Sequence, residues 1–309
     1  MGSRLIAAVA AALAVAGTAV SVTVADSASS APGLSTRAHR AAVDAHSHTV
    51  TTRPGAPTTP ATVPTVTTPA GAAAEPAVIA AADGSTTPYD YAGITTSNGR
   101  DTYVINNVWR PVPGWNQTLY AWNPGNWYVV ANMPAGNTDV LSYPCTQQYY
   151  TTAENTPAPL SDFTSISSTY AVTYSSLAAP NDAEAAYDIW TGVGSSNFTQ
   201  EIMIWNSNQT TPGLPPAGTV VDNAAIDGTA YQVWSTSGKD QNAAGGTITL
   251  LRSSTSQDVN ILAGLLWLEA HGYIPPGSGL NQINYGWEIR STGGRDQKFG
   301  VTGFTISSS

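Results

Sequence analysis

The segment Phe198-Thr199-Gln200-Glu201-Ile202-Met203-Ile204-Trp205 is rich in β-branched and aromatic residues, which indicates a β-strand. Because side chains alternate along a strand, Glu201, Met203 and Trp205 are expected on one face, and Ile202 and Ile204 on the other. A carboxylate among bulky apolar residues is costly unless it is paired, hydrogen-bonded or lining a wet cleft. Glu201 therefore calls for a specific role.

Two other segments repeat this arrangement of an acid in an apolar strand. Alternation in Ala186-Tyr187-Asp188-Ile189-Trp190 puts Asp188 on one face with Trp190. In Tyr285-Gly286-Trp287-Glu288-Ile289 it puts Glu288 on one face with Gly286. The pattern predicts that Asp188, Glu201 and Glu288 face a common groove floored by one sheet.

The chain of 309 residues divides by composition into three parts. Residues 1–25 hold one basic residue, Arg4, then an apolar run of small residues, which predicts a cleaved secretory signal. An uncleaved membrane anchor is the alternative, since the run approaches the length of a span. Residues 26–88, rich in Ala, Thr, Ser and Pro, predict a disordered linker. We therefore expect a secreted protein without stable membrane association after cleavage.

The globular domain is predicted over residues 89–309, because every aromatic residue lies at or after Tyr89. The first 88 residues hold equal numbers of acids and bases, so the net charge of −9 falls on this domain and argues against nucleic acid as a partner. Cys145 is the only cysteine, and a small buried thiol is the expected role. No Cys/His cluster or glycine-rich phosphate loop in the sequence indicates a metal or a cofactor. We expect the protein to be a monomer.

Many short strand-like runs without alternating helices predict an all-β fold, a β-jelly roll or related sandwich of two antiparallel sheets. One helix is expected, with Ser256 as its cap, Asp258 in its first turn and Gly272 near its end. The expected strands lie near residues 102–109, 118–122, 127–133, 165–175, 185–190, 199–205, 229–235, 247–252, 283–289 and 299–306.

Four tryptophans, Trp109, Trp115, Trp122 and Trp127, crowd one segment and are too dense to be explained easily as core alone. In the run 102–109, alternation puts Asn107 and Trp109 on one face. An aromatic ring beside an amide suits a sugar, whose apolar face packs on the indole while its hydroxyls bond the amide. The alternative is that about half of these rings simply fill the interior of a sandwich.

Six motifs follow one another along the globular part: Asn106-Asn107-Val108-Trp109, Ser142-Tyr143-Pro144, Tyr187-Asp188-Ile189-Trp190, Glu201-Ile202-Met203-Ile204-Trp205, Tyr231-Gln232-Val233-Trp234 and Gly286-Trp287-Glu288-Ile289. In these motifs and their order the sequence resembles glycoside hydrolase family 12, the β-jelly-roll endo-β-1,4-glucanases and xyloglucanases. The match spans nearly the whole globular part, and the combination of EIMIW with a downstream G-W-E strand is specific.

The resemblance implies a concave sheet with a long cleft, retaining hydrolysis of a β-glucan polysaccharide and no cofactor. Glu201 matches the family's nucleophile, Glu288 its general acid/base and Asp188 the carboxylate beside the nucleophile. The resemblance also implies sugar-binding positions, which are Asn107, Trp109, Tyr143, Met203 and Trp205.

The chemistry asks for the same pair of carboxyl groups. Glu201 has to be ionised for attack while Glu288 has to be protonated, so their surroundings should push their pKa values apart. Retention predicts carboxyl groups about 5–5.5 Å apart, whereas inversion predicts about 6.5–9.5 Å. The alternative for each acid is a solvated edge-strand position.

Three departures from the family pattern bear on substrate preference. Arg110 follows Trp109 where glycine is usual, a disulfide found in many members is impossible with one cysteine, and the segment 290–294 differs from the glucanases. A related jelly-roll xylanase, a non-catalytic glucan-binding module and a structural surface protein on a Pro/Thr stalk are the alternatives.

Overall fold

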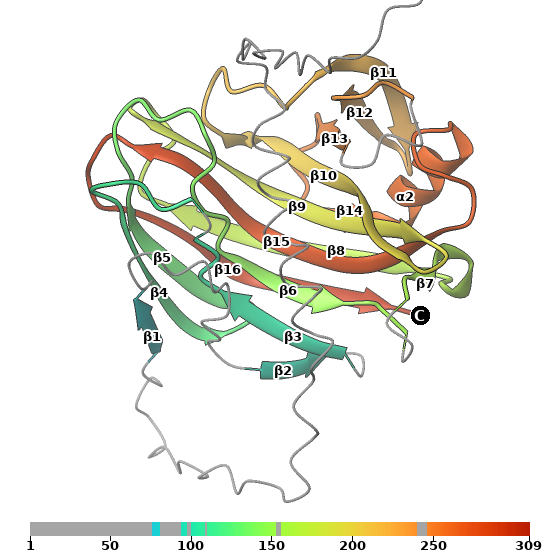
Figure 1. Cartoon of the computed structure of the whole chain (residues 1–309), viewed down its shortest axis with the longest axis horizontal. Coiled ribbons are helices and arrows are strands. Elements are labelled where there is room, and N and C mark those ends of the chain that lie inside the picture. The colour runs from blue at the N-terminus through green and yellow to red at the C-terminus, as the bar shows by residue number, and fades with distance from the viewer. Residues whose placement is uncertain (1–75, 81–93, 98–99, 109, 153–155, 240–245) are drawn as a thin grey trace, which may run out of the picture. The chain divides into compact units, whose positions relative to one another are not determined.

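Two β-sheets form the fold, and their strands are labelled in Figure 1. A computed structural model describes residues 76–80, 94–97, 100–108, 110–152, 156–239 and 246–309, all within the unit Pro32–Ser309. The larger sheet has the order β11 (Thr219–Ile226), β12 (Thr229–Ser235), β13 (Thr247–Arg252), β10 (Ser196–Thr210), β9 (Asn181–Val193), β15 (Ser278–Thr292), β6 (Cys145–Tyr149), β3 (Arg100–Ile105) and β2 (Ile94–Ser97), with β7 (Ala158–Pro159) beside β15.

The smaller sheet completes the sandwich. Its order is β1 (Ala77–Ala80), β4 (Asn116–Asn123), β5 (Asn126–Asn132), β16 (Gln297–Ser308), β8 (Ile166–Tyr174) and β14 (Asp258–Asn260). Among the described residues, every strand pairing is antiparallel except that of β10 with β13. The predicted all-β sandwich is confirmed.

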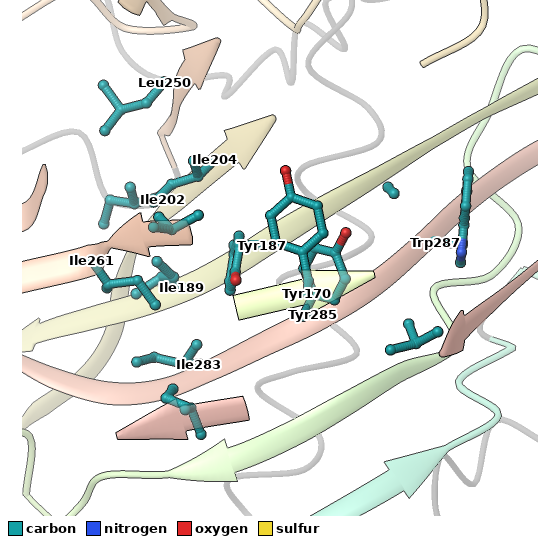
Figure 2. Packing of buried hydrophobic residues seen from close by; sticks show 14 of the residues in the cluster. Tyr170, Tyr187, Ile189, Ile202, Ile204, Leu250, Ile261, Ile283, Tyr285 and Trp287 are labelled. Carbon is teal, nitrogen blue, oxygen red and sulfur yellow. The ribbon is translucent and has the colours of Figure 1, made fainter. Parts of the chain in front are cut away.

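The three central strands β9, β10 and β15 run side by side and put one face into the core between the sheets (Figure 1). Their core-facing side chains are shown in Figure 2, and each is at most 3% exposed. Trp287 also donates its indole N–H to the Gly300 carbonyl of the opposite sheet at 3.1 Å. The core-facing residues of these strands that Figure 2 labels are Tyr187, Ile189, Ile202, Ile204, Ile283, Tyr285 and Trp287.

The helix α2 (Ile261–Ala270) starts later than expected. Its cap is Asn260, whose side chain accepts a hydrogen bond from the Ala263 N–H at 3.1 Å, so the prediction of Ser256 as the cap is wrong. Asp258 lies in β14, which pairs with β8, and is not in the first helical turn. The apolar run continued across both elements, so periodicity alone did not reveal the strand.

The predicted strand over residues 102–109 ends at Ile105. Asn107 adopts a φ of 42°, a left-handed conformation in which asparagine is several-fold enriched among residues other than glycine. The alternation predicted over the run 102–109 therefore does not continue to Asn107.

Residues Ala77–Ala80 were expected within the disordered linker, but they form the edge strand β1 and pair with β4. Their sequence Ala-Val-Ile-Ala is an apolar interruption in a Thr/Pro-rich region, which makes a strand possible there. The signal segment 1–25 and linker residues 26–75 and 81–88 lie outside the described residues. In the part of the chain that is described, no helix has the length and apolarity needed to cross a membrane.

The close packing of β15 against β6 gives a test of the fold. A Cβ added at Gly286 would collide with the Pro144 carbonyl oxygen and lie 2.6 Å from Cβ of Cys145. We expect Gly286→Ala to destabilise the protein by about 2 kcal/mol or more, because backbone would have to move. Urea unfolding followed by circular dichroism measures this change.

The control is Gly264→Ala, in the middle of α2, where the added Cβ meets only the Leu250 methyl at 3.4 Å. Helix propensity favours alanine there by about 1 kcal/mol, so this variant should be neutral or stabilised. Equal unfolding midpoints for the two variants would contradict the packing described for β15.

Candidate active site

Glu201, Asp188 and Glu288 lie on neighbouring strands β10, β9 and β15. Asp188 is directly opposite Met203 of β10 on one side and Asn284 of β15 on the other. Because opposed residues point to the same side of a sheet, all three acids lie on the face that is turned away from the core. The expectation that the acids share one sheet face agrees with this register.

The two glutamates are offset along the strands as well as separated by β9. On β9, Glu201 is opposite Trp190, whereas Glu288 is opposite Glu184. The register fixes their shared face and their order across it. The separation of their carboxyl groups stays a prediction.

Glu201 is held by the strand on its other side, the parallel strand β13. The Thr247 hydroxyl donates to Oε2 of Glu201 at 2.8 Å, and Glu201 itself is only 2% exposed. A neutral donor stabilises the ionised form of a carboxyl group without adding a charge. This contact favours a carboxylate at Glu201.

Tyr143 is within electrostatic range of the other two acids. It is fully buried, and its hydroxyl donates to the Ala186 carbonyl of β9 at 3.0 Å. Burial raises the pKa of Tyr143 well above its ordinary value, and the charges of Cys145, Asp188 and Glu288 raise it further. Asp188 and Glu288 therefore both act on the Tyr143 hydroxyl, which stays protonated.

Glu288 belongs to a cluster of charged side chains. Arg290 binds Glu184 through two contacts, Nη1 to Oε2 at 2.9 Å and Nη2 to Oε1 at 3.2 Å. The same guanidinium lies 3.7 Å from Oε2 of Glu288 and 3.5 Å from Oδ1 of Asp182. Burial raises the pKa of Glu184 well above its ordinary value, the Arg290 charge opposes this, and Glu288 adds to it by charge and hydrogen bonding.

Met203 and Trp205 form a small apolar cluster with Ala186 on the acid face, flanked by Leu214 and Leu251. Their exposed fractions are 5% and 1%, and Tyr143 exposes none of its surface. Met203 and Trp205 of β10 therefore lie on the same face as the acids, and Trp205 is opposite Ala186 of β9. Their contact with a sugar stays a prediction.

Asn107 is half-buried, and its carbonyl accepts a hydrogen bond from the Tyr143 N–H at 2.9 Å. This contact attaches the segment after β3 to Tyr143. Trp109 lies outside the described residues, so the predicted pairing of its indole with Asn107 stays a prediction.

The other tryptophans of the dense segment do not join this site. Trp122 and Trp127 belong to β4 and β5 of the smaller sheet, and Trp115 packs against the core just before β4. Trp127 is buried and donates to the Thr146 hydroxyl at 2.8 Å. The alternative that some of these rings fill the interior of the sandwich therefore holds for Trp127, because the chain crosses to the second sheet after residue 115.

Cys145 is fully buried, as expected for a structural thiol. Burial and the Asp188 charge raise its pKa well above the ordinary value, which argues against a role as a nucleophile. His271 is the C-terminal cap of α2, and its ring stacks on Trp267 with 3.9 Å between ring centroids. It is not on a strand that carries one of the three acids.

Three residues of the site were not predicted as members of it: Thr247, Glu184 and Arg290. Extending the alternation of Asp188 backwards along β9 reaches Glu184, so a signal for this residue was present. Arg290 was recognised only as part of a segment that departs from the family pattern. Thr247 is on a different strand, and nothing in the sequence specified that β13 pairs with β10 in parallel.

One cavity among the described residues lies elsewhere and includes none of the three acids. It has a volume of about 560 Å³ and is lined by hydroxyl-bearing residues of β8 and β16 together with Arg252 and Tyr231. Cavity volume alone therefore does not identify the candidate active site in this fold. The positions of the three acids identify it better.

Comparison with known proteins gives consistent results. The chain matches the model of Glycosyl hydrolase family 12 over residues 117–307. The xyloglucanase domain of NopAA from Sinorhizobium fredii, solved with cellobiose, is similar at 25% identity and a TM-score of 0.55, over 72% of this chain and 98% of that one. The family 12 xyloglucanase of Bacillus licheniformis has 20% identity and a TM-score of 0.56, over 75% and 100%.

Endoglucanase 3 of Trichoderma harzianum is similar to the same degree, with 20% identity and a TM-score of 0.56 over 77% of this chain and 100% of that one. No curated protein sequence matches the chain. The sandwich topology is the family's jelly roll, as predicted.

The fold and the family match define a glycoside hydrolase built on a β-jelly roll. The matched residues cover more than half of the sequence, so the chain belongs to glycoside hydrolase family 12.

The buried state of Cys145 gives a simple test of this site. We expect no reaction of the native protein with a disulfide thiol reagent at mildly alkaline pH, because burial and a raised pKa keep the thiol protonated and covered. The same reagent should modify one thiol per chain in concentrated guanidinium chloride. Full reaction of the native protein would contradict the burial of Cys145.

Proposed function

We propose that this enzyme is a retaining endo-β-1,4-glucanase of the cellulase type, with Glu201 as the nucleophile and Glu288 as the general acid/base. The observation that carries the proposal is the presence of both acids, with Asp188 between them, on one face of neighbouring strands. Asp188 is the residue that supports the nucleophile. Both glutamates lie in the segment that the family model matches.

In the first step the Glu201 carboxylate attacks the anomeric carbon, the bond to the leaving oxygen breaks, and Glu288 gives that oxygen its proton. In the second step water attacks the glycosyl ester, Glu288 takes the proton of the water, and Glu201 leaves as a carboxylate. The hydroxyl of Thr247 supports the ionised state that Glu201 needs before and after this cycle.

The substrate we propose is a β-glucan: cellulose, mixed-linkage glucan or xyloglucan. The similar structures named as xyloglucanases and an endoglucanase support this class, and one of them was solved with cellobiose. Asn107, Trp109, Tyr143, Met203 and Trp205 are the residues proposed to bind the sugars. We also propose export, because residues 1–25 have the layout of a secretory signal.

The deciding experiment measures reducing sugar released by the full chain from carboxymethylcellulose, barley β-glucan, xyloglucan and xylan. Glu201→Gln and Glu288→Gln should each lower the rate by at least about a thousandfold, because each removes a group that acts in the transition state. Glu269→Gln, on α2, is the control and should keep the activity. Hydrolysis that persists in both site variants would exclude this assignment.

The stereochemistry of the first product tests the spacing of the two acids. Proton magnetic resonance at early times should show the β-anomer, which is the result of retention by carboxyl groups about 5–5.5 Å apart. Initial formation of the α-anomer would mean an inverting pair. A folded chain that is inert on all four polysaccharides would instead favour a binding module.

The contact between Thr247 and Glu201 gives a further prediction. Thr247→Val removes the hydroxyl that favours the ionised carboxyl, so the pKa of Glu201 should rise. We expect the acidic limb of kcat/KM to move upward by about one pH unit, since a hydrogen bond to a charged group contributes about 1.5–3 kcal/mol.

Thr249→Val is the matched control, two residues further along β13 and opposite Met203. Its pH profile should equal that of the unmodified enzyme. If the two variants gave the same profile, the Thr247 hydrogen bond would have no part in setting the charge of Glu201.

A further inference from the structure

The cluster around Glu288 contains more acids than bases. Asp182 and Glu184 come from β9, and Glu288 and Arg290 from β15. The side chains of Glu184, Glu288 and Arg290 are 0%, 7% and 13% exposed, whereas that of Asp182 is 29% exposed. One guanidinium therefore faces two buried carboxyl groups and a third that is partly open to solvent.

A β-bulge directs Arg290 into this cluster. Ile289 is opposite Ala183 but Ser291 is opposite Asp182, so Arg290 is the extra residue of β15 at this point. Bulges of this kind re-aim side chains and recur next to active sites. Here the bulge lets one guanidinium contact Glu184 by two bonds while it remains 3.7 Å from Glu288.

The charges of the cluster do not balance if every acid is ionised. Arg290 compensates one buried carboxylate, and a second unpaired carboxylate in a desolvated site is costly. A hydrogen bond between the carboxyl groups of Glu184 and Glu288 relieves this cost, but it requires one proton. The pKa of Glu184, which burial raises, agrees with this argument because it favours a protonated carboxyl group in the pair.

We propose that Glu184 and Glu288 hold one proton between them, with Arg290 fixing both carboxyl groups, so that Glu184 is a positioning residue for the general acid. The proposal rests on the function proposed for Glu288. It gives Glu184 and Arg290 a part in positioning the proton that the leaving oxygen takes.

The remaining groups around Glu288 do not supply a second cation. Tyr143, just before β6, is a neutral group, because burial and neighbouring charges that include Glu288 raise its pKa. On β10 the residue opposite Glu184 is the neutral Thr210. Arg110 pairs with Asp139 at 3.2 Å in a more exposed position. Among the described residues, Arg290 is thus the cation that governs this carboxyl pair.

The alternative is that the Arg290–Glu184 ion pair only stabilises the contact between β9 and β15. Substitutions distinguish this structural role from the shared proton. Glu184→Gln keeps the shape of the side chain but removes its negative charge, which leaves Arg290 uncompensated and favours the Glu288 carboxylate. We expect the alkaline limb of kcat/KM to move downward by about one pH unit. Arg290→Met should move it upward, because the cation is lost.

Two further variants distinguish an effect on the carboxyl pair from a general loss of folding. Arg290→Lys keeps the charge without the fork, so its alkaline limb should lie near that of the unmodified enzyme even if the rate falls. Asp182→Asn is the matched control, because Asp182 touches the same guanidinium but is more exposed, and its limb should move much less. If Glu184→Gln lowered the stability but kept the pH profile of the unmodified enzyme, the role of Glu184 would be only to hold β9 and β15 together.

A measurement without substrate separates this proposal from the proposed function. Carbon-13 resonances of glutamate carboxyl groups, followed through a pH titration, should show one carboxyl of the pair titrating above the ordinary range for glutamate. This titration should move to lower pH in Glu184→Gln. If both carboxyl groups titrated normally, the shared proton would be excluded even in an active enzyme; if the shift were seen in an inactive one, only the hydrolase assignment would fail.

Discussion

The alternation of side chains along β9, β10 and β15 is the constraint on which the site depends. Ile202 and Ile204 are buried against the smaller sheet, so Glu201 and Met203, the residues between and before them, have to lie on the other face. A slip of one residue would exchange the two sets and place a carboxylate in the apolar core. The free energy that fixes the core therefore also fixes which side chains form the acid face.

Placing acids on this face has a cost that the neighbouring strands reduce. Glu201, Asp188 and Glu288 are at most 6% exposed, and carboxylates at such burial need donors or cations nearby. For Glu201 a donor comes from Thr247 on β13, and for Glu288 the nearest cation is Arg290 on its own strand. The site thus depends on the order of strands in the sheet as much as on the acids.

The sequence was sufficient for the fold class and for the common face of the acids, because both follow from periods of two in long strands. It failed where tertiary pairing overrides local pattern, as at Asp258, which extends a helical run but pairs with β8. The left-handed conformation of Asn107 was not predicted, because a strand end cannot be located from alternation. Arg290 escaped because its direction depends on a bulge, which is a property of the pairing of two strands.

The two glutamates differ in what surrounds them, and that difference has a chemical meaning. A neutral hydroxyl beside Glu201 lowers the cost of its negative charge without raising the charge of the region. Beside Glu288, two further acids compete for one guanidinium, so each added negative charge makes the next more costly. The double displacement that we propose needs one carboxylate and one carboxylic acid at the same pH. Because the groups that create this asymmetry are held by strand register and by a bulge, it is present before any substrate binds, and the substrate need not induce it.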